Sequence, residues 1–385
     1  MIGRDKIYRR LQRHLDKQAI GFPATLSGAD IRLLERLFSP EEARLAFFLS
    51  FKPASFEQIR ERVAGAFSAD LVEQLLEAML QKGSVARKEK QGIACWYLMP
   101  LVVGMYECQD GEPSPEFLAD ALAYMKTLSF GSSFLAVKPS QMRTIPINRS
   151  LSPEHPVTTY ESARSIVLAA PGPFVVLPCI CRETHAMRSE PCKKTSRRET
   201  CLGFNHMAAM VLARNHGREV SRDEVLAILE QNEKDGLVLQ PANMKQPDFI
   251  CSCCGCCCGM LGIQKMLPRP VEFWTVSYQV ESDPAKCTGC GRCASRCQVG
   301  AVVLDGKPGT NRKARVNLKR CIGCGLCVPT CPAKAMILRK TGTPDIAENE
   351  KEYFDRVMAN KKGALSQTVT ALKLMLGTGS ARTKV

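Results

Sequence analysis

Two short stretches of the chain repeat the same cysteine spacing. Residues 287–304 read CTGCGRCASRCQVGAVVL and residues 321–338 read CIGCGLCVPTCPAKAMIL, with eight of eighteen positions identical. Each stretch is a Cys-x2-Cys-x2-Cys-x3-Cys run. In such a run the first three cysteines wrap one tight loop, whereas the fourth begins a helix and points away from that loop. The spacing therefore predicts that each loop shares its metal site with the fourth cysteine of the other repeat.

This pattern predicts two [4Fe–4S] clusters with exchanged ligands. The first set is Cys287, Cys290, Cys293 and Cys331, and the second set is Cys321, Cys324, Cys327 and Cys297. Gly289 and Gly323 precede the second cysteine of each run, where a missing Cβ is expected to let the backbone curl close to an inorganic sulfide. Zinc sites seldom use two matched runs of this kind, so a pair of zinc sites is the weaker alternative.

The repeat region resembles the bacterial dicluster ferredoxin, which implies a pseudo-twofold fold around the two clusters. One position departs from the pattern of that family. Pro332 follows the fourth cysteine of the second run, but Gln298 takes the corresponding place in the first. The substitution removes no ligand, and we expect at most a change in the local turn.

Ten further cysteines lie between residues 179 and 258, six of them within residues 251–258. So many thiols close together indicate a metal site, because free thiols at this density are reactive. Ten thiolates suffice for two more cubanes or for one larger cluster, and we predict at least one additional iron–sulfur cluster. Structural zinc and a dithiol redox pair are the alternatives. The candidate ligands are Cys179, Cys181, Cys192, Cys201, Cys251, Cys253, Cys254, Cys256, Cys257 and Cys258.

Two short strings in this region are partly similar to the CCG motifs of heterodisulfide reductases. They read Cys253-Cys254-Gly255 and Cys257-Cys258-Gly259. That resemblance implies a catalytic, noncubane cluster. The long spacing and the downstream Cys-x2-Cys of the motif are missing here.

The chain is strongly basic, with a formal net charge of +15. Residues 283–340 contain twelve Lys or Arg and two acidic residues. Such a charge pattern favours docking of an acidic redox partner protein, because complementary charge speeds encounter. The basic side chains gather between the two repeats, at Lys307, Arg312, Lys313, Arg315, Lys319 and Arg320.

The N-terminal region predicts three helices followed by a β-ribbon. Helices are expected over 39–49, 55–63 and 68–81, and two short strands over 84–99. This order is that of a winged helix-turn-helix. The third helix carries Asp70, Glu73 and Glu77 on its exposed face. These carboxylates repel phosphate, so DNA binding is the weaker interpretation and packing or partner docking the stronger one.

The predicted fold class is α+β and multidomain. We expect a winged-helix-like helical domain at 1–105, a connecting segment at 106–175, a cysteine-rich α/β iron–sulfur domain at 176–268, a dicluster ferredoxin domain at 270–340 and a helical tail at 341–385. The whole chain resembles a set of anaerobic bacterial proteins described as 4Fe-4S ferredoxin-type proteins. The resemblance is carried by Gly21-Phe-Pro-Ala-Thr25, the segment 37–43, Pro178-Cys-Ile-Cys181 and the cluster at 251–258. It implies the same three-part organisation and no particular substrate.

The N-terminus is charged and shows no signal-peptide pattern, and no apolar run reaches membrane-spanning length. A cytoplasmic protein is therefore expected, and the sequence indicates no oligomeric state. The sequence favours a multicluster electron carrier or an electron-transfer subunit of a larger anaerobic oxidoreductase over a stand-alone enzyme. Two alternatives stay open, a redox-responsive DNA-binding regulator and a reductase with a catalytic cluster in the central cysteine region.

Overall fold

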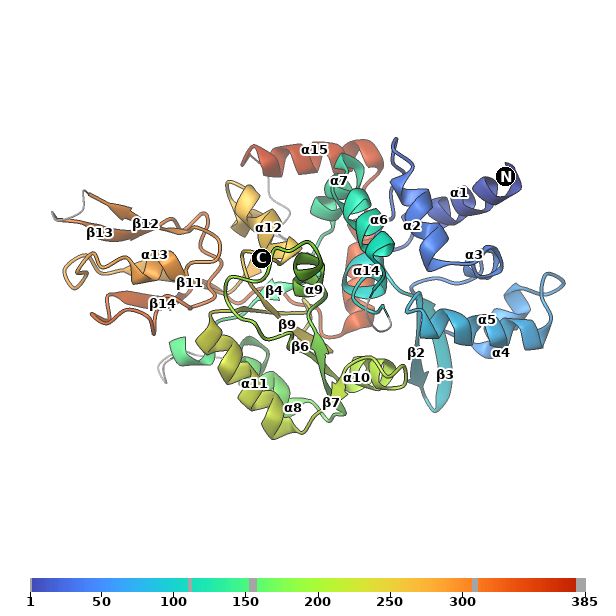
Figure 1. Cartoon of the computed structure of the whole chain (residues 1–385), viewed down its shortest axis with the longest axis horizontal. Coiled ribbons are helices and arrows are strands. Elements are labelled where there is room, and N and C mark those ends of the chain that lie inside the picture. Colours follow the sequence, from blue (N-terminus) through green and yellow to red (C-terminus); the bar gives the residue numbers. More distant parts are fainter. Residues whose placement is uncertain (1, 110–112, 152–157, 307–310, 379–385) are drawn as a thin grey trace. The chain divides into compact units, whose positions relative to one another are not determined.

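The structure is a computed structural model, and it describes residues 2–109, 113–151, 158–306 and 311–378 (Figure 1). The chain divides into two compact units. The first contains residues 1–137, 209–216 and 357–371. The second contains residues 138–208, 217–356 and 372–385, and it includes both groups of metal-binding cysteines.

The first unit is mainly helical. Three serines begin helices as predicted, because the side chains of Ser39, Ser55 and Ser68 each accept a backbone N–H bond in the first turn that follows. A small antiparallel sheet has the strand order β1-β3-β2. The elements are α1 (Ile2–Asp16), α2 (Ala29–Leu37), α3 (Pro40–Ala46), β1 (Ala54–Ser55), α4 (Phe56–Arg62), α5 (Ala69–Gln81), β2 (Val85–Lys90), β3 (Ile93–Leu98), α6 (Pro115–Met125) and α7 (Leu128–Ala136).

Apolar side chains of these helices form the core of the first unit. Leu33, Leu45 and Met79 are fully buried. The buried Asp30 carboxylate is neutralised by Arg9, whose Nη1 lies 2.6 Å from its Oδ2. Cys95 and Cys108 are buried in this unit, as expected for small apolar residues.

The second unit is built on a five-stranded sheet with the order β7-β5-β6-β9-β8. Every strand pair in it is antiparallel, which differs from the α/β arrangement expected for the cysteine-rich region. After β5 the chain passes through α9 and returns along the neighbouring strand instead of crossing the sheet. The elements are β5 (Phe174–Pro178), α9 (Ile180–Met187), β6 (Glu199–Phe204), β7 (Arg218–Glu219), α11 (Arg222–Asp235), β8 (Val238–Pro241), β9 (Phe249–Cys253) and α12 (Gly259–Met266).

The C-terminal part of this unit contains the cysteine repeat. Two antiparallel pairs, β11 with β14 and β12 with β13, enclose the short helix α13 (Figure 1). One strand of each pair precedes a cysteine run, and one follows it. The elements are β11 (Tyr278–Ser282), α13 (Arg292–Arg296), β12 (Val302–Asp305), β13 (Lys313–Val316) and β14 (Met336–Lys340).

Several further elements complete the chain. Helices α10, α14 and α15 each begin in one unit and end in the other. No helix within the described ranges is long and apolar enough to cross a membrane. The elements are β4 (Arg143–Thr144), α8 (Ala163–Ala169), α10 (Asn205–Leu212), β10 (Thr275–Val276), α14 (Glu350–Ala359) and α15 (Ala364–Met375).

The mixture of helices and sheets confirms the α+β class. The five predicted domain boundaries stay predictions. The expected helices at 39–49, 55–63 and 68–81 correspond to α3, α4 and α5 within a few residues. Helices α7, α8, α9 and α12 were not predicted, because they are short and follow no clear apolar period.

Two glycines of the repeat region allow a matched test of packing. Gly323 has φ +71°, and a Cβ there would lie 2.0 Å from the Tyr278 carbonyl oxygen. Gly300 has φ +66° and open space around the position of a Cβ. We expect Gly323→Ala to destabilise the protein by about 3–5 kcal/mol. Gly300→Ala should cost about 1 kcal/mol, the penalty of a left-handed alanine.

The measurement is the thermal midpoint of the anaerobically purified protein, followed by circular dichroism. Gly300→Ala is the control for backbone conformation alone. Equal shifts in the two variants would contradict the close approach of Gly323 to Tyr278.

Candidate metal centres

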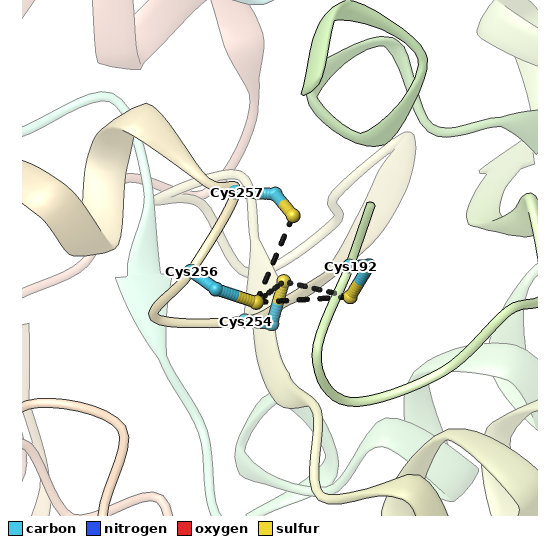
Figure 2. Close-up of side chains that lie close together, drawn as sticks. All are labelled: Cys192, Cys254, Cys256 and Cys257. Atoms are coloured by element: carbon cyan, nitrogen blue, oxygen red, sulfur yellow. Dashed lines mark hydrogen bonds between the residues drawn. The ribbon is translucent and has the colours of Figure 1, made fainter. Parts of the chain in front are cut away.

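Four central cysteines converge on one point (Figure 2). Cys192 comes from the loop after α9, and Cys254, Cys256 and Cys257 come from the loop between β9 and α12. The sulfur of Cys192 lies 3.5 Å from that of Cys254 and 3.7 Å from that of Cys256. Cys256 lies 3.4 Å from Cys254 and 3.7 Å from Cys257. We call this set the four-thiol site.

The spacing of the four-thiol site fits a single tetrahedral metal ion. A zinc–sulfur bond of about 2.3 Å places tetrahedral sulfurs about 3.8 Å apart. Within the described ranges, this is the one set of three or more metal-binding side chains whose donor atoms all lie within 4.8 Å of one another. A cubane binds its four thiolates through four different irons, so its ligand sulfurs lie further apart.

The surroundings of Cys192 favour its thiolate. Burial opposes ionisation, but the backbone N–H groups of Lys194 and Thr195 and the Arg182 guanidinium outweigh it and lower the pKa of Cys192 to about 6. The Lys194 nitrogen lies 3.5 Å from the Cys192 sulfur. Burial raises the pKa of Cys254 to about 11, against the opposing charge of Arg182. Metal binding would supply the charge that the deeper thiols require, since the ligand form of cysteine is the thiolate.

The other six central cysteines are not part of the four-thiol site, although Cys181 packs against its Cys254 and Cys257. Cys201 is on β6, and Cys251 and Cys253 are on β9. Cys179 is the N-cap of α9, with Cys181 in its first turn, and Cys258 is the N-cap of α12. The ten predicted candidate ligands thus fall into a group of four and a group of six.

Arg182 lies against thiols of both groups. Its side chain is buried, with 4% exposed. Nη1 donates to the hydroxyl of Thr200, and Nη2 donates to the carbonyl oxygen of Ser252 at 3.0 Å. Burial alone would lower the pKa of Arg182, but the nearby thiolates of Cys179 and Cys254 raise it. A buried guanidinium in this place stabilises negative charge on both groups.

The C-terminal cysteines are held in two matching loops. Gly289 and Gly323 have φ +72° and +71°, as a tight left-handed turn requires. A Cβ at Gly289 would lie 2.2 Å from the Arg312 carbonyl oxygen, just as one at Gly323 would meet Tyr278. In the structure, these glycines are therefore needed for close contact with neighbouring backbone, which the sequence analysis did not anticipate.

Backbone N–H groups point at the sulfurs of both repeats in the same pattern. Ala301 donates to Cys297 at 3.1 Å, and Ala335 donates to Cys331 at 3.2 Å, each from four residues further along the chain. The N–H of Ala314 lies 3.3 Å from the Cys287 sulfur, and that of Val280 lies 3.4 Å from the Cys321 sulfur. Such donors stabilise thiolate sulfur, so the residues present fit anionic iron–sulfur clusters.

The fourth cysteine of each run lies near the loop of the other. Burial raises the pKa of Cys293, and the charges of Cys287 and Cys331 raise it further. Burial also raises the pKa of Cys324 to about 12, and Cys297 contributes to that shift. These charges relate Cys331 to the loop of Cys287 and Cys293, and Cys297 to the loop of Cys321 and Cys324. The assignment of these eight side chains as cluster ligands stays a prediction.

Comparison with known proteins supports the same chemistry. Residues 286–335 match the 4Fe-4S dicluster domain family. The chain is an iron–sulfur protein. No curated protein matches the chain, and no solved structure matches it. The match covers the repeat region alone, so the ten central cysteines of this iron–sulfur protein are interpreted from their geometry.

The basic side chains between the repeats are partly engaged within the iron–sulfur protein. Arg315 pairs with Asp305 at 2.6 Å, and Lys313 donates to the Cys287 carbonyl oxygen at 2.6 Å. Arg320 donates to the carbonyl oxygens of Lys265, Leu267 and Val299. Lys307 lies outside the described residues. Lys319 is exposed, and Arg312 is half-buried. Three of the six side chains therefore make contacts within the chain.

Sequence reasoning missed the roles of two residues in these sites. Arg182 follows Cys181 directly, but a single basic residue beside a cysteine is a weak signal. Gln298 was noted because it replaces a proline, and the structure gives it a role. Its Oε1 accepts the N–H of Gly255 at 2.9 Å, and its Nε2 donates to the Gly236 carbonyl oxygen at 3.0 Å.

Paired substitutions test the predicted exchange of ligands. Cys297→Ser with Cys324→Ser removes two ligands from one predicted cluster, so we expect a loss of about four irons per chain. Cys297→Ser with Cys290→Ser removes one ligand from each cluster, and the expected loss is about eight irons. The measurement is anaerobic iron and sulfide analysis, with EPR of the reduced protein. Losses in the reverse order would show that each run binds its own cluster.

Proposed function

We propose that the chain is a multicluster iron–sulfur electron-transfer protein, a carrier or the electron-transfer subunit of a larger anaerobic oxidoreductase. A [4Fe–4S] cluster takes up and releases one electron, and the matched domain family binds two of them. The ten central cysteines would hold at least one additional iron–sulfur cluster. The observation that carries the proposal is the contact between the repeat region and the central cysteine loop.

That contact is made through Gln298. Gln298 follows Cys297, a predicted cluster ligand, and is 5% exposed. Gly255, which it binds, lies between Cys254 and Cys256 of the four-thiol site. A Cβ at Gly255 would lie 2.4 Å from the Gln298 carbonyl oxygen, so the two backbones are in close contact. One hydrogen bond therefore links a predicted ferredoxin ligand to the central metal site.

Two arginines fix the same contact on either side. Arg296 donates from Nη2 to the carbonyl oxygens of Glu233 and Lys234, at 2.9 and 2.6 Å, near the end of α11. Arg320 binds carbonyl oxygens in and just after α12. These bonds connect the repeat region with the central region inside the second unit. A fixed geometry between metal centres suits electron transfer, which depends on a short and constant separation.

We propose that the first unit contains a winged-helix-like domain that docks a partner protein. Its support is the order α3, β1, α4, α5, β2 and β3, with β3 between the other two strands. Asp70, Glu73 and Glu77 of α5 are exposed, and their charge opposes binding of that helix to DNA phosphate. The second unit would receive an acidic redox partner on its exposed basic side chains, including Lys319. The reducing cytoplasm is the compartment that fits so many free cysteines.

Substitution of Gln298 tests the proposed electron path. Gln298→Ala removes the side-chain hydrogen bonds to Gly255 and Gly236 but no ligand, so the iron content should stay at the wild-type value. Electron equilibration between the ferredoxin clusters and the central centre should slow at least several-fold. The measurement is rapid-freeze EPR after mixing the oxidised protein with dithionite. Gln367→Ala on α15, where Nε2 binds the Lys362 carbonyl oxygen, is the matched control.

Two results would argue against the proposal. Unchanged equilibration in Gln298→Ala would show that electrons do not pass through this contact. An iron content of about eight per chain in the wild-type protein would refute the additional cluster.

A further inference from the structure

The two cysteine loops of the repeat region differ in their exposure to solvent. Cys290, the middle cysteine of the first loop, is exposed, whereas the matching Cys324 of the second loop is half-buried. Their neighbours divide in the same way. The exposed neighbours are Thr288 and Arg292, and the matching buried residues are Ile322 and Leu326. We call residues 288–292 the open loop and residues 322–326 the covered loop.

A segment from outside the repeats covers the second loop. The backbone N–H of Ile147 donates to the carbonyl oxygen of Cys324 at 3.1 Å. The hydroxyl of Ser150 donates to the Ile147 carbonyl oxygen at 2.7 Å, which holds this segment in a compact turn. A Cβ at Gly325 would clash with the side chain of Ser150, so the segment is in close contact with the loop.

The matching position of the open loop is in contact with its own repeat. A Cβ at Gly291, which corresponds to Gly325, would lie 3.1 Å from the side chain of Leu304. The neighbour at this position therefore comes from β12 and not from residues 147–150. The same cysteine spacing thus produces one loop that faces solvent and one that lies beneath another segment.

The covered loop is the one linked to the central region. Its predicted fourth ligand is Cys297, and the following Gln298 accepts the N–H of Gly255. The covering segment is also tied to α11, because the N–H of Asn148 donates to Oε1 of Glu233 at 2.7 Å. Of the two predicted ferredoxin clusters, the one on the covered loop is therefore the inner cluster and the one on the open loop is the outer cluster.

The charge beside the open loop is positive. Arg292 is exposed and lies two residues after Cys290. Lys286 is exposed as well, and its Nζ lies 3.4 Å from Oδ2 of Asp283, a surface pair of small energetic weight. Residues 284–300 contain three basic residues and no acidic residue. Such a surface favours the approach of an acidic protein.

We propose that the open loop is the surface on which an acidic one-electron redox protein docks, and that electrons leave or enter the chain through the outer cluster. The proposal rests on the proposed function, since it requires both ferredoxin clusters. In one encounter a single electron passes from the outer cluster to the oxidised partner, so the cluster is oxidised and the partner is reduced. A second electron then passes from the inner cluster to the outer one. A reduced partner reverses both steps.

The test reverses one charge beside the open loop and removes no predicted ligand. Arg292→Glu should weaken the binding of oxidised flavodoxin, an acidic one-electron carrier that serves as the protein probe. Electron transfer from the reduced chain to flavodoxin should slow at least several-fold at low ionic strength. Electron transfer to hexaamminecobalt(III), a small cationic oxidant, should become faster. The measurements are isothermal titration calorimetry and anaerobic stopped-flow absorbance.

The cationic oxidant separates docking from a change in reduction potential. A change in potential would shift both rates in the same direction, whereas a docking charge shifts them in opposite directions. Lys373→Glu is the matched control, because Lys373 is an exposed lysine of α15 and its substitution changes the net charge by the same amount. We expect both rates of this control to stay near the wild-type values.

Two results would overturn the proposal. They are equal effects of Arg292→Glu and Lys373→Glu, and wild-type flavodoxin binding and rates in Arg292→Glu. In either case, the EPR signals of two reduced ferredoxin clusters in the wild-type protein would keep the proposed function. Absence of those signals from the wild-type protein would remove the proposed function and this proposal with it.

Discussion

The buried cysteine sulfurs of the second unit need nearby positive charge or hydrogen-bond donors before they can ionise. Thiolates that lie side by side repel one another, and burial removes the water that would screen them. The buried Arg182 guanidinium provides positive charge close to Cys179 and Cys254. Backbone N–H groups stabilise the sulfurs of the repeat loops, where Ala301 and Ala335 donate to Cys297 and Cys331. Bound metal would supply the remaining positive charge, which would couple metal binding to folding in this unit.

The contact at Gln298 joins the two kinds of metal centre. In the dicluster ferredoxin that the repeat resembles, this place is taken by proline, which has no side-chain hydrogen bonds. Glutamine can both accept and donate, and it does so toward Gly255 and Gly236. The departure from the family pattern is therefore what connects the repeat to the central region. A proline at this position could not accept the hydrogen bond from Gly255 of the central loop.

Local patterns in the sequence predicted much of this structure. The cysteine spacing predicted that Cys331 lies near the first loop and Cys297 near the second, because the reach of a tight loop depends on a few neighbouring residues. The helices expected at 39–49, 55–63 and 68–81 correspond to α3, α4 and α5 for the same reason, since each begins at a serine N-cap, which is a local signal. The sequence could not divide the ten central cysteines, because that division depends on the pairing of β6 with β9 and on two helix starts. Arg182 was missed since its burial follows from the packing of distant segments.

The central claim is that one chain carries electrons on ferredoxin clusters and on a further central cluster. A coulometric titration of the anaerobic full-length protein, followed by EPR, tests this most directly. The account predicts an uptake of more than two electrons per chain, with about two of them in the signals of the ferredoxin clusters. An uptake of about two electrons, all in those signals, would contradict it.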